Sequence, residues 1–357
     1  MKRMKLDKSA VSADDEKKTR LQTASQCPTG CIEVETDIDP GLEVITLDEL
    51  TIECEKNKSH KSFIPIDKFS RLDLLSRYQD EVTEQAVKVL ADLTVQVTAA
   101  WVSEDRPEKY PSGEAEYPYV KERGGTMLRK GSGYVQKVVT YGKGSGMKDP
   151  CECRECRYSS SARDVWWEVE VVSARHIIYD HTEARGANID LFYDGSTGIG
   201  RKERKKMKGY NSMWGSSVDG DRCVLFCPTH DEQLAHTLKD LCKTADRLVR
   251  EANSRHQHQV GPHMAVVVSH PHGCQKYITV GESTTTDKLD EEGRQTYTYT
   301  ADTCRGSSGG LVWVVGRWEL TSYVTAPHSR VLDKRNNKSG DRWLARLIWT
   351  NNRFKYT

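Results

Sequence analysis

The sequence contains no apolar run approaching the roughly 18 residues that would span a bilayer. Its opening, MKRMKLDKSAVSADDEKKTR, also lacks the apolar stretch of a secretory signal. These two absences argue against a membrane protein and against a secreted one. We therefore expect an intracellular protein, most simply a cytoplasmic one, with no membrane partner.

An excess of one charge sign is absent as well. The 53 Lys and Arg residues balance the 52 Asp and Glu residues, which leaves a formal net charge of +1 over 357 residues. The overall charge therefore gives no reason to expect a nucleic acid as the partner. One basic run at 201–208, RKERKKMK, could contact phosphates, but a solvated hairpin tip is the simpler interpretation because no aromatic residues are interleaved with the charges.

Cysteines are present, but their number does not indicate a disulfide framework. The 11 cysteines are an odd number, and in a chain without a secretory signal they are expected to be reduced thiols. Cys151, Cys153 and Cys156 in CECREC are close enough to bind a metal, but a zinc site normally takes four ligands and no second pair has finger spacing. We therefore predict a surface loop here, no metal and no cofactor. His270 and His272 in SHPHG are likewise assigned to a loop.

Large apolar side chains are nearly absent from residues 1–26. Such a segment cannot bury enough surface to offset the entropy of ordering, so a disordered tail is predicted. Residues 27–120 are predicted to be an N-terminal extension with one long helix. Between Leu72 and Trp101 the apolar residues recur at three- and four-residue steps, which is the period of an amphipathic helix.

From about residue 127 the pattern changes to short runs rich in β-branched and aromatic residues, separated by Gly, Asp and Asn. This pattern predicts a mostly β region. One stretch at 230–256 keeps leucine and alanine at helical spacing, and it divides the strands into two groups. The runs are GYVQKVVTY, WWEVEVV, IDLFY, RCVLF, MAVVVSH, YITV, QTYTYT, LVWVV and ELTSYV.

The segment DTCRGSSGGLVWVV, residues 302–315, carries the clearest chemical signal. Gly306, Gly309 and Gly310 surround Ser308 directly ahead of an apolar strand. Small residues let backbone N–H groups turn toward one point, and acyl transfer needs such donors for the oxyanion while a hydroxyl attacks. We predict Ser308 as nucleophile, with the N–H groups of Gly306 and Ser308 as oxyanion donors. A flexible glycine-rich loop is the alternative interpretation of this string alone.

The string DTCRGSSGG resembles the nucleophile loop of the trypsin-like serine proteases. Upstream, VVSARHIIYD is similar to the segment that carries the catalytic histidine of that family, here His176, and VDGDRCVLF to the segment that carries the catalytic aspartate, here Asp221. The order His, Asp, Ser is also the order in this family. With KGSGYVQKVV and MAVVVSHPHGCQKYITVGE, the resemblance covers residues 127–345.

The resemblance implies a mostly β chain with two antiparallel β-barrels of the trypsin-like type, an inter-barrel helix and a helical N-terminal extension. The protease domain would occupy residues 121–357, with the first barrel near 127–228, the helix at 230–256 and the second barrel near 260–350. It also implies a serine endopeptidase that acts on polypeptides through an acyl-enzyme. The oligomeric state stays open.

The resemblance assigns His176 as general base toward Ser308 and Asp221 as the carboxylate that orients its imidazole. Asp219 in the same Asp-Gly-Asp turn competes for that role, and Asp221 is preferred because it directly abuts the apolar run of the next strand. A protease-like fold that has lost efficient catalysis and serves as a binding module is the second hypothesis. Arg175, which stands where a small residue is usual, leaves that hypothesis open.

Asp302 lies six residues before Ser308, at a position that resembles the base of the specificity pocket in family members that cut after Arg or Lys. A buried carboxylate there would bind a cationic side chain. The opposite wall should come from residues 324–329, VTAPHS, which lack the glycines that keep such a pocket open, so this preference is an expectation only. Ser307 replaces an aspartate that pairs with a newly cut N-terminus in many secreted members, so activation by that ion pair is not expected.

Overall fold

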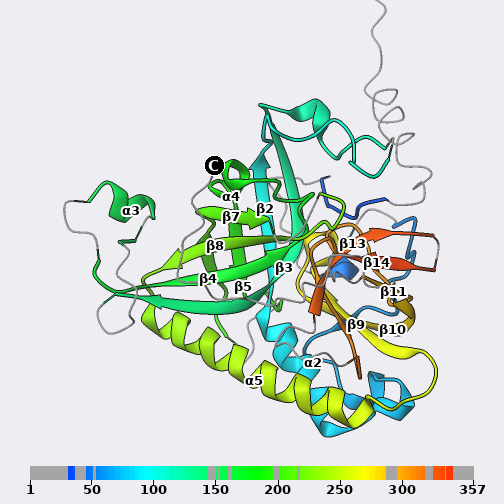
Figure 1. Ribbon diagram of the computed structural model, residues 1–357. Helices are drawn as coiled ribbons and strands as arrows, with labels where there is room; N and C mark the ends of the chain where they lie inside the picture. The colour runs from blue at the N-terminus through cyan, green and yellow to red at the C-terminus, as the bar shows by residue number, and fades with distance from the viewer. Residues whose placement is uncertain are drawn as a thin grey trace, which may run out of the picture.

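The computed structural model of the chain is mostly β, and it describes residues 31–36, 46–50, 54–113, 115–142, 150–151, 153–159, 163–195, 202–214, 218–286, 296–317, 325–333 and 335–340. Two seven-stranded antiparallel sheets lie side by side, and one long helix connects them (Figure 1). The predicted arrangement of two groups of strands divided by a helix is therefore confirmed. None of the helices in the described ranges is both long and apolar enough to cross a membrane.

The first sheet is built around β3, whose 16 residues are long enough to pair with β2 on one side and β4 on the other. Register shifts interrupt both ladders, and irregularities of this kind bend a strand and increase its twist. The strand order is β6-β5-β2-β3-β4-β8-β7. The strands are β2 (Thr94–Trp101), β3 (Thr126–Tyr141), β4 (Trp166–Ser173), β5 (Asn188–Leu191), β6 (Lys205–Lys208), β7 (Asn211–Trp214) and β8 (Cys223–Thr229).

The second sheet closes into a six-stranded barrel. β9 pairs with β12 on one side and with β10 on the other, so the order β10-β11-β14-β13-β12-β9 returns to its start, and the short β1 adds to β10. All residues of β9 and β12 are buried, which explains why both read as continuous apolar runs. The strands are β1 (Ile64–Pro65), β9 (His263–Ser269), β10 (Tyr277–Thr286), β11 (Tyr297–Tyr299), β12 (Leu311–Val314), β13 (Thr325–Val331) and β14 (Asn337–Ser339).

The connection between the sheets is α5 (Glu232–His256), in agreement with the helix predicted at 230–256. The side chain of Asp231 caps its first turn by accepting the N–H of Leu234 at 2.9 Å. The helix packs on α2 (Glu81–Leu93) and on β3 and β4 of the first sheet. The other helical elements are short: α3 (Arg154–Arg157), α4 (His181–Ala184), η2 (Leu47–Glu49), η3 (Arg71–Asp73), η4 (Ser76–Tyr78), η5 (Val120–Glu122) and η6 (Pro271–Gly273).

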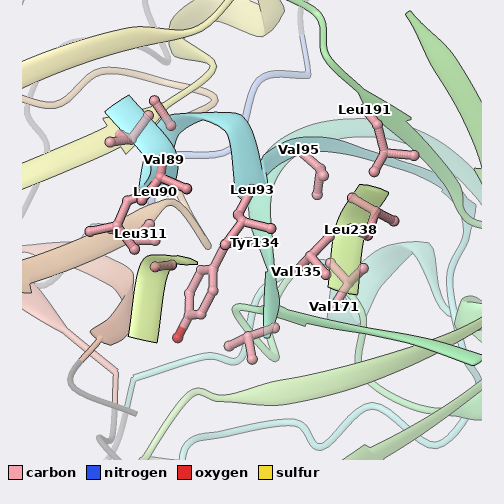
Figure 2. Close-up of a cluster of buried hydrophobic side chains, with 14 of the residues drawn as sticks. Val89, Leu90, Leu93, Val95, Tyr134, Val135, Val171, Leu191, Leu238 and Leu311 are labelled. Carbon is pink, nitrogen blue, oxygen red and sulfur yellow. The ribbon is translucent and has the colours of Figure 1, made fainter. Parts of the chain in front are cut away.

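Both sheets share one hydrophobic core with α2 and α5. Figure 2 shows Leu90 of α2, Tyr134 of β3, Leu238 of α5 and Leu311 of β12 in the same cluster of buried side chains. Burying each leucine of such a cluster stabilises a fold by roughly 1.5–3 kcal/mol. The shared core therefore fixes the position of one sheet relative to the other, and with it the residues at their junction.

The helix predicted between Leu72 and Trp101 is wrong except for α2. That helix begins after Asp80, whose side chain accepts two backbone N–H groups of the first turn, and it ends at Leu93. Residues 94–101, TVQVTAAW, form β2 and pair with β3 and β5. Valine and threonine at alternate positions suit a strand as well as they suit the helical spacing, and here the strand pairing prevails.

The domain boundary predicted at residue 121 does not coincide with a structural boundary, because strands from both sides of it pair with each other. Residues 94–101 belong to the first sheet, residues 64–65 pair with β10 in the second, and Ile32 forms a bridge with Arg330. The described part of 27–120 is therefore built into both sheets, and it is not a separate extension. Residues 1–26, for which a tail was predicted, and 341–357 lie outside the described residues.

Candidate active site

His176 and Asp221 meet at one end of the first sheet. His176 follows β4 and Asp221 precedes β8, so the pairing of these two strands brings the side chains together. The Nδ1 atom of His176 lies 2.8 Å from Oδ2 of Asp221 and 3.0 Å from Oδ1. Asp219, the competing candidate, accepts a hydrogen bond from Ser112 instead. Asp221 is therefore the carboxylate that contacts the imidazole.

Asp221 is held as a carboxylate although it is buried. Burial alone would raise its pKa, but the adjacent His176 imidazole, the guanidinium of Arg330 and the hydroxyl of Ser329 together lower the pKa. The Ser329 hydroxyl donates to Oδ2 at 2.5 Å. The backbone of Asp221 has a φ of 48°, a region that residues other than glycine seldom adopt, and such strain is concentrated at functional sites.

A buried ion pair supports the loop that carries His176. The side chains of Arg106 and Glu183 are fully buried, and Nε and Nη2 of Arg106 each lie 2.7 Å from a different carboxylate oxygen of Glu183. Nη2 also donates to the carbonyl of His176 at 3.1 Å. Two parallel N–H to oxygen bonds fix the planes of both groups, so the pair gives this loop a rigid contact.

Ser308 lies in a tight turn before β12. Gly306 and Gly309 have φ values of 87° and 79°, in the left-handed region that favours glycine. A Cβ on Gly306 would lie 2.4 Å from the carbonyl oxygen of His270, and a Cβ on Gly309 would lie 2.1 Å from that of Ser132. The glycines of this string are thus required both by the backbone conformation and by the close approach of neighbouring backbone.

The turn around Ser308, the predicted nucleophile turn, joins the two sheets. The carbonyl of Ser308 accepts a backbone N–H from β3 at 2.7 Å, and the N–H of Gly309 donates to the carbonyl of His328 in β13 at 2.7 Å. A Cβ on Gly309 would also lie 3.0 Å from the nitrogen of Ala174, two residues before His176. The serine and the histidine therefore lie on neighbouring segments at this junction.

The junction thus combines a serine in a glycine turn, a histidine paired with a carboxylate, and two antiparallel sheets that meet beside them. The fold is that of the chymotrypsin-like serine proteases. The predicted architecture of the trypsin-like type is confirmed, with a closed second barrel and a curled first sheet. The Nε2 atom of His176 is buried and has no hydrogen-bond partner within the described ranges.

Solved structures that resemble this chain include a protease of M. tuberculosis and an HtrA-type protease. The Rv3671c protease from M. tuberculosis, in its active form, is 12% identical with a TM-score of 0.34 over 71% of this chain and 78% of that one. The HtrA-type protease AlgW, solved with a decapeptide, is 12% identical with a TM-score of 0.36 over 71% and 62% of the two chains. Deg5 is 10% identical with a TM-score of 0.37 over 74% and 90%. No protein-family model and no curated protein matches the sequence.

Residues 31–35 lie against the turn that carries Ser308. The carbonyl oxygen of Glu33 accepts the N–H of Gly306 at 2.8 Å and the N–H of Ser308 at 3.1 Å, the two donors predicted for an oxyanion. The N–H of Glu33 donates to Oγ of Ser308 at 3.0 Å. The carbonyl oxygen of Glu33 thus lies at the position that the sequence predicts for an oxyanion, and its N–H contacts the hydroxyl.

Backbone pairing holds this segment on both sides of Glu33. On the amino side, the carbonyl of Cys31 accepts the N–H of Val331 in β13 at 2.8 Å. On the carboxyl side, Glu35 and Lys130 of β3 exchange two hydrogen bonds of 2.9 Å each. The segment is therefore an additional antiparallel strand bound between the two sheets, which is how extended peptides add to sheet edges.

The side chain of Glu33 enters a pocket that offers two donors. Nζ of Lys56 lies 2.7 Å from Oε1, and Nε2 of His328 lies 2.8 Å from Oε2. Burial alone would raise the pKa of Glu33, but the two donors outweigh it and lower the pKa from 4.5 to about 2. The pocket therefore stabilises the ionised carboxylate above pH 4.5, and this stabilisation is lost as the pH falls from 4.5 towards 2.

Polar groups behind the pocket hold these donors in place. The Tyr299 hydroxyl lies 2.5 Å from Nδ1 of His328. Burial lowers the pKa of His328, so the ring is assigned as neutral, with Nδ1 accepting from the tyrosine and Nε2–H donating to the carboxylate. Nζ of Lys56 also donates to Thr303 at 2.8 Å and to Asn337 at 3.1 Å. A cation and a neutral donor are thus each held by contacts other than those with Glu33.

The preference for Arg or Lys that the sequence assigns to Asp302 stays a prediction, and the contacts around Glu33 involve another group. Oδ2 of Asp302 accepts a hydrogen bond from Ser62 at 2.6 Å, and the charge in the pocket is the cation Lys56. Sequence reasoning missed Lys56 and Glu33, which come from far upstream. His328 lies in VTAPHS, the stretch assigned to the pocket wall, where a histidine in place of glycine was a usable signal.

Proposed function

We propose that the protein is a serine endopeptidase that hydrolyses the peptide bond on the carboxyl side of glutamate. The observation that carries this proposal is the position of Glu33. Its carbonyl oxygen accepts the N–H groups of Gly306 and Ser308, while its carboxylate is bound by Lys56 and His328. A site that binds both the carbonyl and the carboxylate of one glutamate residue is suited to cut directly after it.

In the proposed reaction, Oγ of Ser308 attacks the carbonyl carbon of the glutamate while Nε2 of His176 takes the hydroxyl proton. Asp221 fixes the imidazole tautomer through Nδ1 and stabilises the imidazolium. The two backbone N–H groups of the nucleophile turn stabilise the oxyanion. The imidazolium then protonates the leaving amine, and water hydrolyses the ester on Ser308 with the same base.

The chemistry of the pocket supports glutamate over other side chains. A glutamine would keep a hydrogen bond to His328 but would lose the ion pair with Lys56. The carboxylate of an aspartate would stop one methylene short of both donors. A lysine or arginine would place a like charge next to Lys56, and a buried charge without a partner costs several kcal/mol. An uncharged apolar side chain would leave both donors without an acceptor.

The full-length protein is expected to cleave an internally quenched peptide with glutamate before the scissile bond about 100-fold faster, in kcat/KM, than matched peptides with Gln, Lys or Leu there. The panel is measured with the wild-type chain and with Glu33→Lys, whose own segment no longer fits the pocket. Mass spectrometry of the products locates each cut. Ser308→Ala serves as the control and is expected to cleave none of the peptides.

The competing hypothesis, a binding module with this fold, predicts a different result. Glutamate peptides would then bind, but neither protein would cleave any peptide, and a fluorophosphonate probe would not label Ser308. That combination in folded protein would refute the proposal. A preference for Lys, Arg or Leu before the cut would refute the proposed specificity and leave a serine endopeptidase of another kind.

A further inference from the structure

We propose that the chain cuts its own peptide bond between Glu33 and Val34, an inference that rests on the proposed function. Contacts on both sides hold this bond in place, through β13 on the amino side and β3 on the carboxyl side. Glu33 and Val34 are only 4% and 6% exposed, so the segment fills the cleft. An external polypeptide can enter only after this segment has been cut or displaced.

The reaction needs no reactant besides water. Oγ of Ser308 forms a bond to the carbonyl carbon of Glu33, and the C–N bond to Val34 breaks. The hydroxyl proton passes through His176 to the departing nitrogen of Val34. Water then hydrolyses the ester, which leaves a carboxylate on Glu33 and restores the hydroxyl of Ser308. The products are one chain that ends at Glu33 and one that begins at Val34.

Cleavage here would open the site, and it would not be needed to form the oxyanion donors or the contact between His176 and Asp221. The N–H groups of Gly306 and Ser308 already point at one oxygen while the chain is uncut. The contact between His176 and Asp221 is also complete. The new amino group at Val34 therefore has no part in forming the oxyanion donors, in agreement with the serine at position 307 in place of an aspartate.

Intact mass and N-terminal sequencing of the purified full-length chain test the proposal. The wild-type chain is expected to convert to a product that begins at Val34, whereas Ser308→Ala and Glu33→Lys stay uncut. Thr36→Ala is the matched change in the same segment, and it is still expected to be cut because it leaves the two backbone hydrogen bonds between Glu35 and Lys130 in place. The rate is expected to be independent of protein concentration, since the cut segment belongs to the same chain.

The outcomes separate this inference from the proposed function. A wild-type chain that keeps this bond intact while it cleaves added glutamate peptides overturns self-cleavage and leaves the proposed function in place. A folded chain that cleaves neither its own bond nor any peptide overturns both. Cutting of Ser308→Ala at the wild-type rate would identify a foreign protease as the agent and would also overturn self-cleavage.

A second inference rests on a different observation, a cluster of thiols and imidazoles formed by Cys54, His60, His272 and Cys304. The two Sγ atoms lie 3.6 Å apart and the two Nε2 atoms 3.3 Å apart. All four ligand atoms lie within 4.8 Å of one another. Tetrahedral zinc with its usual bond lengths places two sulfurs about 3.8 Å apart and two nitrogens about 3.4 Å apart. The cluster therefore has the spacing of a zinc site with two cysteines and two histidines.

Neighbouring groups form hydrogen bonds to the ligand residues, as is usual around zinc sites. Nδ1 of His272 lies 3.1 Å from the carboxylate of Glu35, the kind of partner that a zinc-bound histidine normally has on its other nitrogen. Asn57 donates its backbone N–H to Sγ of Cys54 at 3.4 Å and its side-chain amide to Sγ of Cys304 at 3.1 Å. An ion here would join the nucleophile turn to the segment that carries the pocket lysine.

Cys151, Cys153, Cys156 and His230 form a second cluster, and their ligand atoms also lie within 4.8 Å of one another. Sγ of Cys156 lies 3.5 Å from Nε2 of His230. The fourth ligand that the sequence analysis lacked is thus His230, which is 74 residues beyond Cys156. It directly follows β8 and the cysteines precede β4, so the pairing of these two strands brings the ligands together.

The geometry points to one zinc ion in each cluster, in contrast to the expectation from the sequence that the chain binds no metal. The described cysteines are free thiols except for Cys31, which is disulfide-bonded, so the ligands are available. Protein purified under reducing conditions from zinc-supplemented medium is expected to contain about two zinc ions per chain by elemental analysis. Exchange for Co²⁺ is expected to give the thiolate charge-transfer absorption of a tetrahedral site.

Single substitutions assign the two ions. Cys54→Ser is expected to lose one zinc and Cys156→Ser the other, whereas Cys242→Ser, which lies on α5 outside both clusters, retains both. Wild-type protein with almost no zinc and no cobalt absorption would overturn both sites, and this result does not depend on the folding of any variant. If the wild type contains one zinc ion, and only Cys156→Ser loses it, the site beside the nucleophile turn is overturned.

Discussion

Ser308→Ala is expected to lower kcat for a glutamate peptide by about 10⁴- to 10⁶-fold, because it removes the attacking hydroxyl and leaves only the oxyanion donors and substrate binding. Both proteins are compared in the Glu33→Lys background, in which residue 33 no longer fits the pocket. KM is then expected to change little, since the pocket donors on Lys56 and His328 are untouched. Initial rates over a range of substrate concentrations give kcat and KM separately. The kcat of His176→Ala is expected to fall by a similar factor, because the serine and the histidine act as a unit.

Asp221→Asn extends this prediction to the third residue. An asparagine keeps the shape but favours the wrong imidazole tautomer, and a loss of about 10⁴-fold in kcat is expected. Ser112→Ala, an exposed serine on the surface, is the matched control and is expected to keep full activity. Activity of Ser308→Ala within tenfold of the wild type would contradict the assignment of the nucleophile.

The second large effect is expected at the pocket cation. Lys56→Met leaves the bound carboxylate without its ion pair and is expected to lower kcat/KM for a glutamate peptide by about 30- to 1000-fold, or about 2–4 kcal/mol. This range lies below the upper values for fully buried pairs because the side chain of Lys56 is 26% exposed. A glutamine peptide makes no ion pair with Lys56, so its kcat/KM is expected to change little. The ratio of the two kcat/KM values therefore reports the charge recognition alone.

Lys58→Met is the control for this prediction, since it removes an exposed lysine two positions along the chain. Its ratio of glutamate to glutamine cleavage is expected to equal that of the wild type. A Lys56→Met enzyme that still prefers glutamate over glutamine by the wild-type factor would show that Lys56 does not select the substrate. In that case His328 would remain as the group that recognises the side chain.

Features that depend on neighbouring residues could be predicted from the sequence. The helix at 230–256, the runs that became β3, β4, β8, β9 and β12, and the glycine turn around Ser308 all follow from local periodicity and backbone conformation. Asp221 was preferred over Asp219 because it abuts an apolar strand, and that strand, β8, pairs with the one before His176. Local order in the sequence is thus sufficient where a strand places the side chain directly.

Features that depend on distant contacts could not be predicted in this way. Nothing in the residues next to Lys56 indicates a pocket. Its hydrogen-bond partners lie 23 to 281 positions away in the sequence. Residues 94–101 match a helix in spacing, and only pairing with β3 and β5 identifies them as a strand. His230 as a fourth ligand for CECREC likewise follows from the pairing of β4 with β8.

The hydrogen bond between Lys56 and Asn337 spans 281 positions of the chain. Translation proceeds from the amino end, so the segment around Glu33 and its lysine leave the ribosome before the Ser308 hydroxyl and the last strands of the second sheet. Under the proposed function, the growing polypeptide cannot be cut after Glu33 while the 275 positions up to Ser308 are being synthesised. Under the proposed function, hydrolytic capacity arises only when the second barrel is assembled, and the nearest glutamate is then the one already held in place.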